Sequence, residues 1–349
     1  MTKRLSHIVI ALLAIVAMAS CQRRPLEEMS EKVSVRVKVN ISAVANVTTN
    51  VYNDRIPAPD ITTDMMRVMV YDPSNHDLLT QSFIFNKTLD ESGNQVLSGD
   101  LNISYGTYDI LVYNFDVAST QIAAENNEES IIAYTDEISN SMKSSLFGYN
   151  ASKADIDEFE HIQYEPDHLV VARENDLRVS PHDTVVVINT TATTIIDTYY
   201  IQIRVKGLKF ASTANAIISG LSPSNHFGTN KRTTDPSTAV AFELHKSTDP
   251  NIADENQDVL CATFNTFGKI PDASSNLYVT FNVIDAAGNL QKYSTSLDTI
   301  FQTEDAIERH WLLINETFEI KDPGISTGGN GGFQPVVDEW EEEEGSVTL

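Results

Sequence analysis

The chain has 349 residues, of which 49 are acidic and 24 are basic, so its formal net charge is −25. This length suffices for two domains, and a hydrophobic fraction of 41% is typical of a globular protein rather than a disordered one. The negative balance argues against nucleic acid as a partner, because phosphate binding requires clustered Lys and Arg side chains. The two cysteines, Cys21 and Cys261, are too few for a framework of disulfides.

The first twenty residues have the features of an export signal. An apolar run over residues 8–19 follows two basic residues and is too short to span a bilayer, which takes about 20 residues. Small residues then precede Cys21, and this arrangement resembles a bacterial lipobox, although Met18 stands where Leu is preferred. We therefore expect a lipoprotein signal peptide over residues 1–20, a lipid on Cys21 and a tether over residues 21–31. The alternative is a plain secretory signal with a coincidental cysteine.

Alternating apolar residues predict that the body opens with a half-buried strand. The alternation has the period of a β-strand and comprises Val33, Val35, Val37, Val39 and Ile41. Further strands are expected at residues 66–71, 79–85, 109–115 and 168–172. The stretch before the last of these is rich in Ser, Asn and Glu, and we expect loops there with short helices around residues 125–134 and 142–147.

A second group of strands follows after a break near residues 173–176. These strands are expected at residues 184–189, 195–205, 240–244, 259–264, 277–284, 292–297 and 311–320, with a short strand or helix at 214–219. Recurring strands with turn signals between them favour antiparallel β-sandwiches. We therefore predict an all-β fold with an N-terminal sandwich domain over residues 32–175 and a C-terminal one over residues 176–322. A Gly-rich hinge and an acidic strand or tail would follow over residues 323–349.

The search for chemistry gives no usable site. Residues 324–328 fit G-x-S-x-G, but they lie in a Gly-rich tail and no histidine follows His310. The eight histidines show no H-E-x-x-H pattern, and the acidic loop around Asp249 and Asp254 lacks the spacing of a calcium site. We therefore expect neither an enzyme nor a cofactor, and no metal site.

Several segments together resemble one known family. They are residues 21–26 at the lipid site, 105–114 (YGTYDILVYN), 200–208 (YIQIRVKGL), 264–268 (FNTFG) and the closing run from Gly331 to Trp340. Their order resembles that of the Bacteroidales fimbrillin-like lipoproteins, which include the anchor and accessory subunits of type V fimbriae. This resemblance implies two transthyretin-like β-sandwich domains in tandem. It also implies that the partners are other fimbrial subunits, joined by strand exchange.

In polymerising members of that family, a trypsin-like protease removes the first strand and opens a groove. Arg55 and Ile56, in a Pro-containing loop after the first strand, would flank such a cleavage site; Arg55 can equally be an ordinary loop residue. The residues that would take part in strand exchange are the five apolar residues of the first strand together with Val336, Val337, Val347 and Leu349. An uncleaved chain would be an anchor or terminator, and a cleaved one a stalk or tip subunit.

The rival interpretation is a surface protein that binds a glycan or another host ligand. It requires exposed aromatic rings, for which Tyr199, Tyr200, Trp311 and Trp340 are the candidates, although such residues in strands usually pack in a core. In either interpretation we expect a non-enzymatic protein that is lipid-anchored in the outer membrane at the cell surface.

Overall fold

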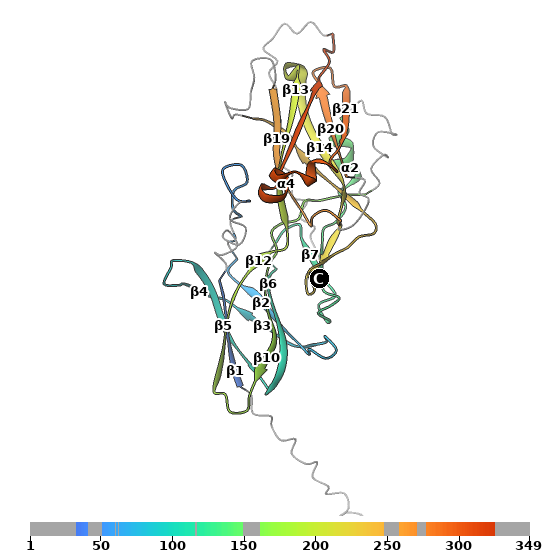
Figure 1. The fold of residues 1–349 in the computed structure, drawn as a ribbon. Helices are drawn as coiled ribbons and strands as arrows, with labels where there is room; N and C mark the ends of the chain where they lie inside the picture. Colours follow the sequence, from blue (N-terminus) through green and yellow to red (C-terminus); the bar gives the residue numbers. More distant parts are fainter. Residues whose placement is uncertain are drawn as a thin grey trace, which may run out of the picture.

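The computed structural model describes residues 33–40, 51–59, 61, 63–115, 117–148, 161–247, 258–270 and 277–324. These residues are mostly in strands, which form five sheets. Figure 1 shows two β-sandwich units, with the N-terminal unit below and the C-terminal unit above. The predicted all-β fold with two sandwiches is confirmed.

The N-terminal unit packs a four-stranded sheet against a five-stranded one. The four-stranded sheet consists, in spatial order, of β11 (Val185–Thr191), β1 (Val33–Asn40), β5 (Gln95–Ile103) and β4 (Asn86–Leu89). The five-stranded sheet consists of β12 (Thr193–Thr194), β10 (Val170–Val179), β6 (Gly106–Asn114), β2 (Met66–Tyr71) and β3 (Leu78–Ile84). Side chains that alternate along these strands meet between the sheets, and Val35, Val68, Leu97, Val112 and Val170 are among them.

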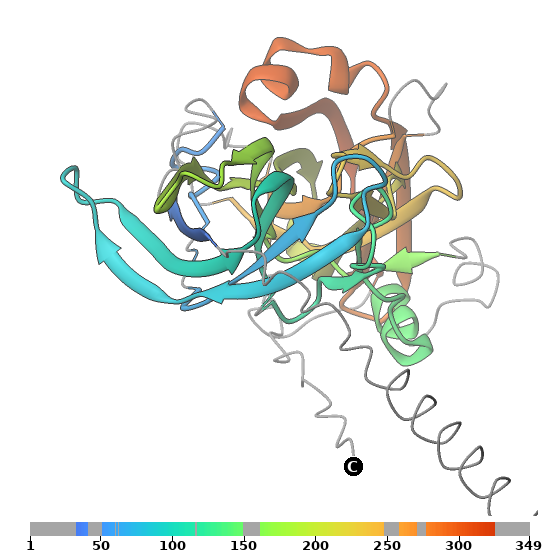
Figure 2. The ribbon, with the colours of Figure 1, turned by 90° about the horizontal axis from the view of Figure 1, so that it is seen from below.

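The hairpin of β4 and β5 projects from the body of this unit, as the cyan and teal arm in Figure 2 shows. It leaves Phe85 and Leu89 exposed. Strand β5 is absent from the strands expected from the sequence, although Leu97, Leu101 and Ile103 follow a period of two. Gly99 interrupts the apolar pattern because a Cβ there would lie 2.9 Å from the Cγ2 atom of Ile84.

The C-terminal unit repeats the two-sheet plan. One sheet consists of β18 (His245–Lys246), β19 (Asp258–Thr266), β13 (Asp197–Lys206) and β22 (Trp311–Glu319). The other consists of β21 (Leu290–Ser296), β20 (Tyr278–Asp285), β14 (Ala211–Leu221), β17 (Thr238–Glu243) and β9 (Ile162–Gln163). Ile201, Ile203, Ile218, Phe242 and Phe281 belong to the core between them. Helix α4 (Glu304–Arg309), capped by the Thr303 side chain, leads into β22.

A small fifth sheet joins the two units. It consists of β16 (Lys231–Arg232), β15 (Ser224–His226), β8 (Ile132–Tyr134) and β7 (Gln121–Ala123), so strands from both halves of the chain pair in it. Its residues cover the outer face of the five-stranded sheet of the N-terminal unit. Phe227 there packs edge-on against Tyr113, with ring centroids 5.1 Å apart. The junction is therefore a hydrophobic interface rather than a simple linker.

Helix α2 (Asn140–Phe147) precedes the C-terminal unit in sequence but packs on it. Leu146 and Phe147 contact a cluster that includes Ile217 and Ala239, and the Nδ2 atom of Asn215 donates to the Leu146 carbonyl oxygen at 2.6 Å. The expected helix at residues 142–147 is confirmed. Neither helix of the described residues has the length and apolar character needed to cross a membrane.

The helix expected around residues 125–134 is wrong. The structure has turns there, followed by β8. Across Ile131 and this strand, Ile131 and Ala133 are buried while Ile132 and Tyr134 are partly exposed. This alternation is the period of a strand, and the covering partner β15 comes from a distant part of the chain. The helix prediction failed because it depended on composition alone.

Strands β11 and β12, which the sequence interpretation assigned to the C-terminal domain, pair with β1 and β10 of the N-terminal unit. The stretch before β11 resembles a linker but is a tight turn. The Asp183 amide donates to the Ser180 carbonyl oxygen at 3.0 Å, and the Ser180 amide donates to the Asp183 carboxylate at 2.7 Å. The chain thus returns to the first sandwich before it enters the second with β13.

A polar network lies near the point where the chain passes from the first sandwich to the second. It contains two side chains with shifted pKa values, Glu165 and His168. The Asn265 amide donates to Glu165 Oε2 at 2.8 Å, and Thr198 Oγ1 lies 2.8 Å from Asn265 Oδ1 and 3.3 Å from His168 Nε2. Burial raises the pKa of Glu165 to about 7, with a further contribution from the Asp167 charge. Burial lowers the pKa of His168 to about 4. The folded protein therefore disfavours charge on both side chains at neutral pH.

We expect the substitution Glu165→Gln to stabilise the protein at pH 8. The folded-state pKa of Glu165 is raised, so protonation of this side chain favours the folded state. This contribution to stability is complete below the pKa that Glu165 has in the unfolded chain, and it is lost as pH rises through about 7. Glutamine keeps the acceptor for Asn265 without the buried charge, and the gain should be about 1–3 kcal/mol at pH 8 and near zero at pH 5. Thermal unfolding at the two pH values measures it.

The exposed residue Glu308 on α4 provides the control for this prediction. Glu308→Gln should leave the unfolding temperature nearly unchanged at both pH values. His168 is unchanged in every protein compared, so its contribution to the pH dependence of stability cancels. An equal effect of Glu165→Gln at pH 8 and pH 5 would contradict the prediction.

Candidate functional site: the first strand and the Arg55 segment

Strand β1 is an internal strand of its sheet. It pairs in parallel with β11, from Ser34 opposite Val185 to Asn40 opposite Thr191. On its other side it pairs antiparallel with β5, from Val33 opposite Ile103 onward. The strand predicted from the alternating valines is therefore present, and its backbone is paired along both edges.

The core-facing side of β1 is closely packed. Val35 and Val37 have no exposed surface and Val33 is 5% exposed, and all three belong to the core between the two sheets. Each buried valine stabilises the fold by about 1.5–3 kcal/mol relative to an exposed one. Loss of β1 would expose this strip and leave β5 and β11 with unpaired backbone groups, which is a surface that a replacement strand could fill.

The segment after β1, residues 51–56, packs on the C-terminal unit; we refer to it as the Arg55 segment. Val51 is 6% exposed and Ile56 is fully buried, and both pack against Tyr200 of β13. The backbone is held as well, because Thr263 Oγ1 donates to the Arg55 carbonyl oxygen at 3.2 Å. The segment that follows the first strand in sequence is therefore held on the second sandwich by both side chains and backbone.

The Arg55 side chain lies over aromatic rings of the C-terminal unit. Its guanidinium carbon is 4.3 Å from the ring centroid of Trp311 and 5.3 Å from that of Tyr200. A guanidinium at such distances attracts the ring faces by about 0.5–2 kcal/mol. The bond between Arg55 and Ile56 is thus held against the protein on both sides, and a protease can reach it only after the segment opens.

The aromatic residues considered for glycan binding are differently placed. Tyr199 is 7% exposed and stacks on His310 in the C-terminal core, with centroids 4.6 Å apart. Tyr200 is 6% exposed and lies beneath Arg55 together with Trp311. These three residues therefore present no open ring face of the kind that sugars stack on.

The remaining predicted site residues lie outside the described residues. They are Cys21, Ile41, Val336, Val337, Trp340, Val347 and Leu349, and Val39 is described only in its backbone. The G-x-S-x-G match also lies beyond the described part of the chain, apart from its first residue, Gly324.

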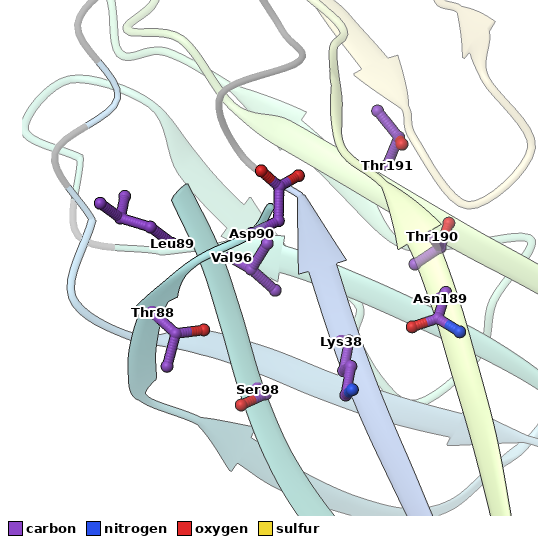
Figure 3. A pocket seen from close by; sticks show the side chains of 9 residues that line it. All are labelled: Lys38, Thr88, Leu89, Asp90, Val96, Ser98, Asn189, Thr190 and Thr191. Carbon is purple, nitrogen blue, oxygen red and sulfur yellow. The ribbon is translucent and has the colours of Figure 1, made fainter. Parts of the chain in front are cut away.

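A shallow polar hollow crosses the outer face of the sheet that contains β1 (Figure 3). Lys38 on β1 lies between Ser98 on β5 and Asn189 on β11, and the hollow has a volume of about 440 Å³. Asp90, at its rim, accepts the backbone amides of Ser92 and Asn94 and so holds its own turn. The hollow depends on β1 remaining in place, and the residues that line it do not pair a nucleophile with a base.

One cluster of the described residues has the chemistry of a metal site. His76, Asp109 and Glu128 come together at a second cavity beside the fifth sheet. The sequence predicts no metal site, because these residues are far apart in the chain and match no ligand motif.

Comparison with known proteins identifies relatives among fimbrial proteins. The profile of a family described as "Domain of unknown function (DUF5119)" matches residues 21–243. A Bacteroides ovatus protein named as a fimbrium anchoring subunit, Fim4B, is 25% identical over 151 residues, which are 43% of this chain and 41% of that protein. The match thus spans less than half of that relative. The predicted resemblance to Bacteroidales fimbrial proteins is confirmed.

Two solved structures are similar to the chain. A Bacteroides ovatus protein described as an adhesin has a TM-score of 0.58 at 16% identity, and the alignment covers 87% of this chain and 98% of that one. The fimbrial anchor protein Mfa2 from Porphyromonas gingivalis has a TM-score of 0.47 at 12% identity, covering 81% and 88%. The first of these similarities supports the two-sandwich architecture.

We expect Val51→Ala to accelerate cleavage after Arg55 by trypsin. The substitution removes two buried methyl groups at a distance from the scissile bond, which weakens the packing of the segment by about 1.5 kcal/mol. Cleavage of a transiently opened segment follows the population of the open form, so the rate should rise roughly tenfold. Mass spectrometry of the new N-terminus at Ile56 over time measures this rate.

Val187→Ala is the matched control, because Val187 lies on β11 and is 48% exposed. It should leave the rate unchanged. Equal rates for Val51→Ala and the unmodified chain would mean that residues 51–56 are already open in solution.

Proposed function

Since the chain belongs to the family of the domain of unknown function DUF5119, and a relative is named as a fimbrium anchoring subunit, we propose that it is a structural subunit of fimbriae. Its role is non-enzymatic, and it serves in cell adhesion as an anchor or accessory protein. Within the residues that the structure describes, the Arg55 segment and the hollow beside β1 offer packing surfaces rather than catalytic groups, which supports this role.

The observation that carries the proposal is the state of the first strand. β1 fills the position between β5 and β11, so the unit has no groove to receive a strand from a neighbouring subunit there. The packing of Arg55 and Ile56 on the C-terminal unit protects the bond whose cleavage would release β1. A subunit whose acceptor groove is already filled ends a chain of strand exchanges, and this is the role of an anchor.

The proposal places the protein at the outer membrane. The lipid on Cys21 holds the chain there, and residues 22–31 separate the lipid from β1. Two or more acyl chains hold a protein stably on a membrane, whereas a single chain binds only marginally. Because cleavage after Arg55 would separate Cys21 from the body, retention of β1 and retention of the lipid depend on the same bond.

Contact with the next subunit is assigned to the C-terminal segment. Val336, Val337, Val347 and Leu349 follow a Gly-rich hinge and supply apolar side chains for a donated strand. The carboxylates between them, from Asp338 to Glu344, disfavour pairing between copies of this segment because like charges repel.

Mass spectrometry of the native protein from outer membranes and from sheared surface fibres tests the anchor role. We expect one form in the membrane fraction, acylated at Cys21 and continuous through Arg55, because the scissile bond is packed. A mature N-terminus at Ile56 in the fibre fraction would contradict the anchor role and would identify a polymerising subunit.

Crosslinking in cells tests the partner. The unmodified chain should be recovered with other fimbrial subunits, and the double substitution Val336→Asp and Val337→Asp should reduce that recovery at least tenfold. The matched control, Glu341→Ala with Glu342→Ala, changes the same segment without altering its apolar residues and should retain the crosslinks. Failure of the unmodified chain to crosslink any fimbrial subunit would contradict the proposed function.

A further inference from the structure

His76, Asp109 and Glu128 meet where the N-terminal unit contacts the fifth sheet. His76 lies in the turn between β2 and β3, Asp109 lies on β6, and Glu128 lies in the loop between β7 and β8. One potential ligand atom from each lies within 4.8 Å of the other two. All three residues line a cavity of about 520 Å³.

The backbone holds the two loop residues of this cluster together. The Glu128 amide donates to the His76 carbonyl oxygen at 2.9 Å, and the His76 amide donates to the Asp72 carbonyl oxygen at 2.8 Å. A Cβ on Gly228 would clash with the Glu128 carbonyl oxygen, so the turn between β15 and β16 approaches this loop as closely as glycine allows. The side chains are thus brought together by the fold and not by chance contact of mobile loops.

Both carboxylates are nine-tenths buried, since Asp109 and Glu128 are each 8% exposed. Asp109 Oδ1 accepts the Asp176 amide at 2.8 Å, and Glu128 Oε2 lies 3.2 Å from His76 Nδ1. The other oxygen of each carboxylate receives no hydrogen bond from the described residues. A carboxylate held away from bulk water is costly to keep charged, and a bound cation is one way to compensate that cost.

The side chains that line the cavity carry more negative than positive charge. Four carboxylates line it, from Asp109, Glu128, Glu129 and Asp176. Among the described residues that line it, Arg173 is the only one with a permanent positive charge, and its Nη2 atom donates to the Phe227 carbonyl oxygen. The cavity therefore has a deficit of positive charge.

We propose that His76, Asp109 and Glu128 bind one divalent transition-metal ion of the zinc class. An imidazole nitrogen combined with two carboxylates suits Zn²⁺, whereas Ca²⁺ and Mg²⁺ prefer oxygen ligands alone. Ligand atoms of a tetrahedral zinc site lie about 3.3 Å apart, given zinc–ligand distances near 2.0–2.1 Å. A small closure of the present cluster reaches that geometry, and the cavity leaves room for water as the fourth ligand.

Glu129 supplies the second partner of the histidine ring. His76 Nδ1 faces Glu128, and Nε2 lies 3.7 Å from Glu129 Oε1 on the other side of the ring. With the metal on Nδ1, the Nε2 hydrogen points toward this carboxylate, which is the usual arrangement for a metal-bound histidine. The ion would link the β2–β3 turn to the loop before β8, and so fasten the fifth sheet to the N-terminal unit.

Calorimetric titration of the purified full chain with Zn²⁺, after treatment with a chelator, tests the site. We expect one equivalent to bind, with a dissociation constant at least tenfold weaker in Asp109→Asn and in Glu128→Gln. Zn²⁺ should also raise the unfolding temperature of the unmodified chain but not of these variants. Without metal both variants should be at least as stable as the unmodified chain, because each removes a buried charge.

His161→Ala is the matched control, because His161 Nδ1 lies 2.6 Å from a Glu137 carboxylate oxygen and this pair is not part of the cluster. It should bind Zn²⁺ as the unmodified chain does. Absence of binding at one equivalent, unchanged affinity in Asp109→Asn and Glu128→Gln, or loss of binding in His161→Ala would each overturn the site. Tighter binding of Ca²⁺ than of Zn²⁺ would overturn the assignment of metal class.

Discussion

The pairing of β1 between β11 and β5 is the constraint on which the N-terminal unit depends. The three core-facing valines, Val33, Val35 and Val37, pack between the two sheets, and the backbone of the strand is hydrogen-bonded to both neighbouring strands. The pairing with β11 is parallel, so the two strands are distant in sequence and no short loop joins them. Removal of β1 would therefore leave β11 without a neighbour on that side, and not only open the core.

The same strand connects to the rest of the molecule through the Arg55 segment. Ile56 is buried against the C-terminal unit and Arg55 lies over Trp311, so the chain is held at residues 51–56 before it forms β2. The fifth sheet joins the two units at a separate point, where Phe227 packs on Tyr113. The two sandwiches are thus tied by an N-terminal segment and by a shared sheet.

Much of the fold could be predicted from the sequence, because a strand with one buried face has apolar residues at every second position. The alternating valines of β1 and the long apolar run of β13 are examples. Strand β5 was not predicted, because Gly99 stands in place of an apolar residue at a position where Ile84 leaves no room for a side chain. The assignment of β11 failed for another reason, since a period of two does not say which sheet a strand joins. That depends on the tight turn at Ser180 and Asp183 and on the parallel pairing with β1.

The site was predictable only in part. Sequence patterns indicated the first strand and the arginine after it, but not that Ile56 would be buried, because the covering residues, Tyr200 and Trp311, lie far along the chain. The cluster of His76, Asp109 and Glu128 has no ligand spacing in the sequence, since three separate elements of the fold bring it together. Distant pairings of this kind are decided by tertiary packing, which single-sequence patterns do not record.

Hydrogen–deuterium exchange of the full chain tests the central claim, that β1 is a permanent internal strand, most directly. The account predicts that amides of β1 exchange as slowly as those of the internal strand β6, because their protection requires opening of the whole sheet. Exchange in β1 as fast as in the exposed edge strand β4 would contradict it. That result would mean that the groove between β5 and β11 opens in the native protein and can receive a strand from another subunit.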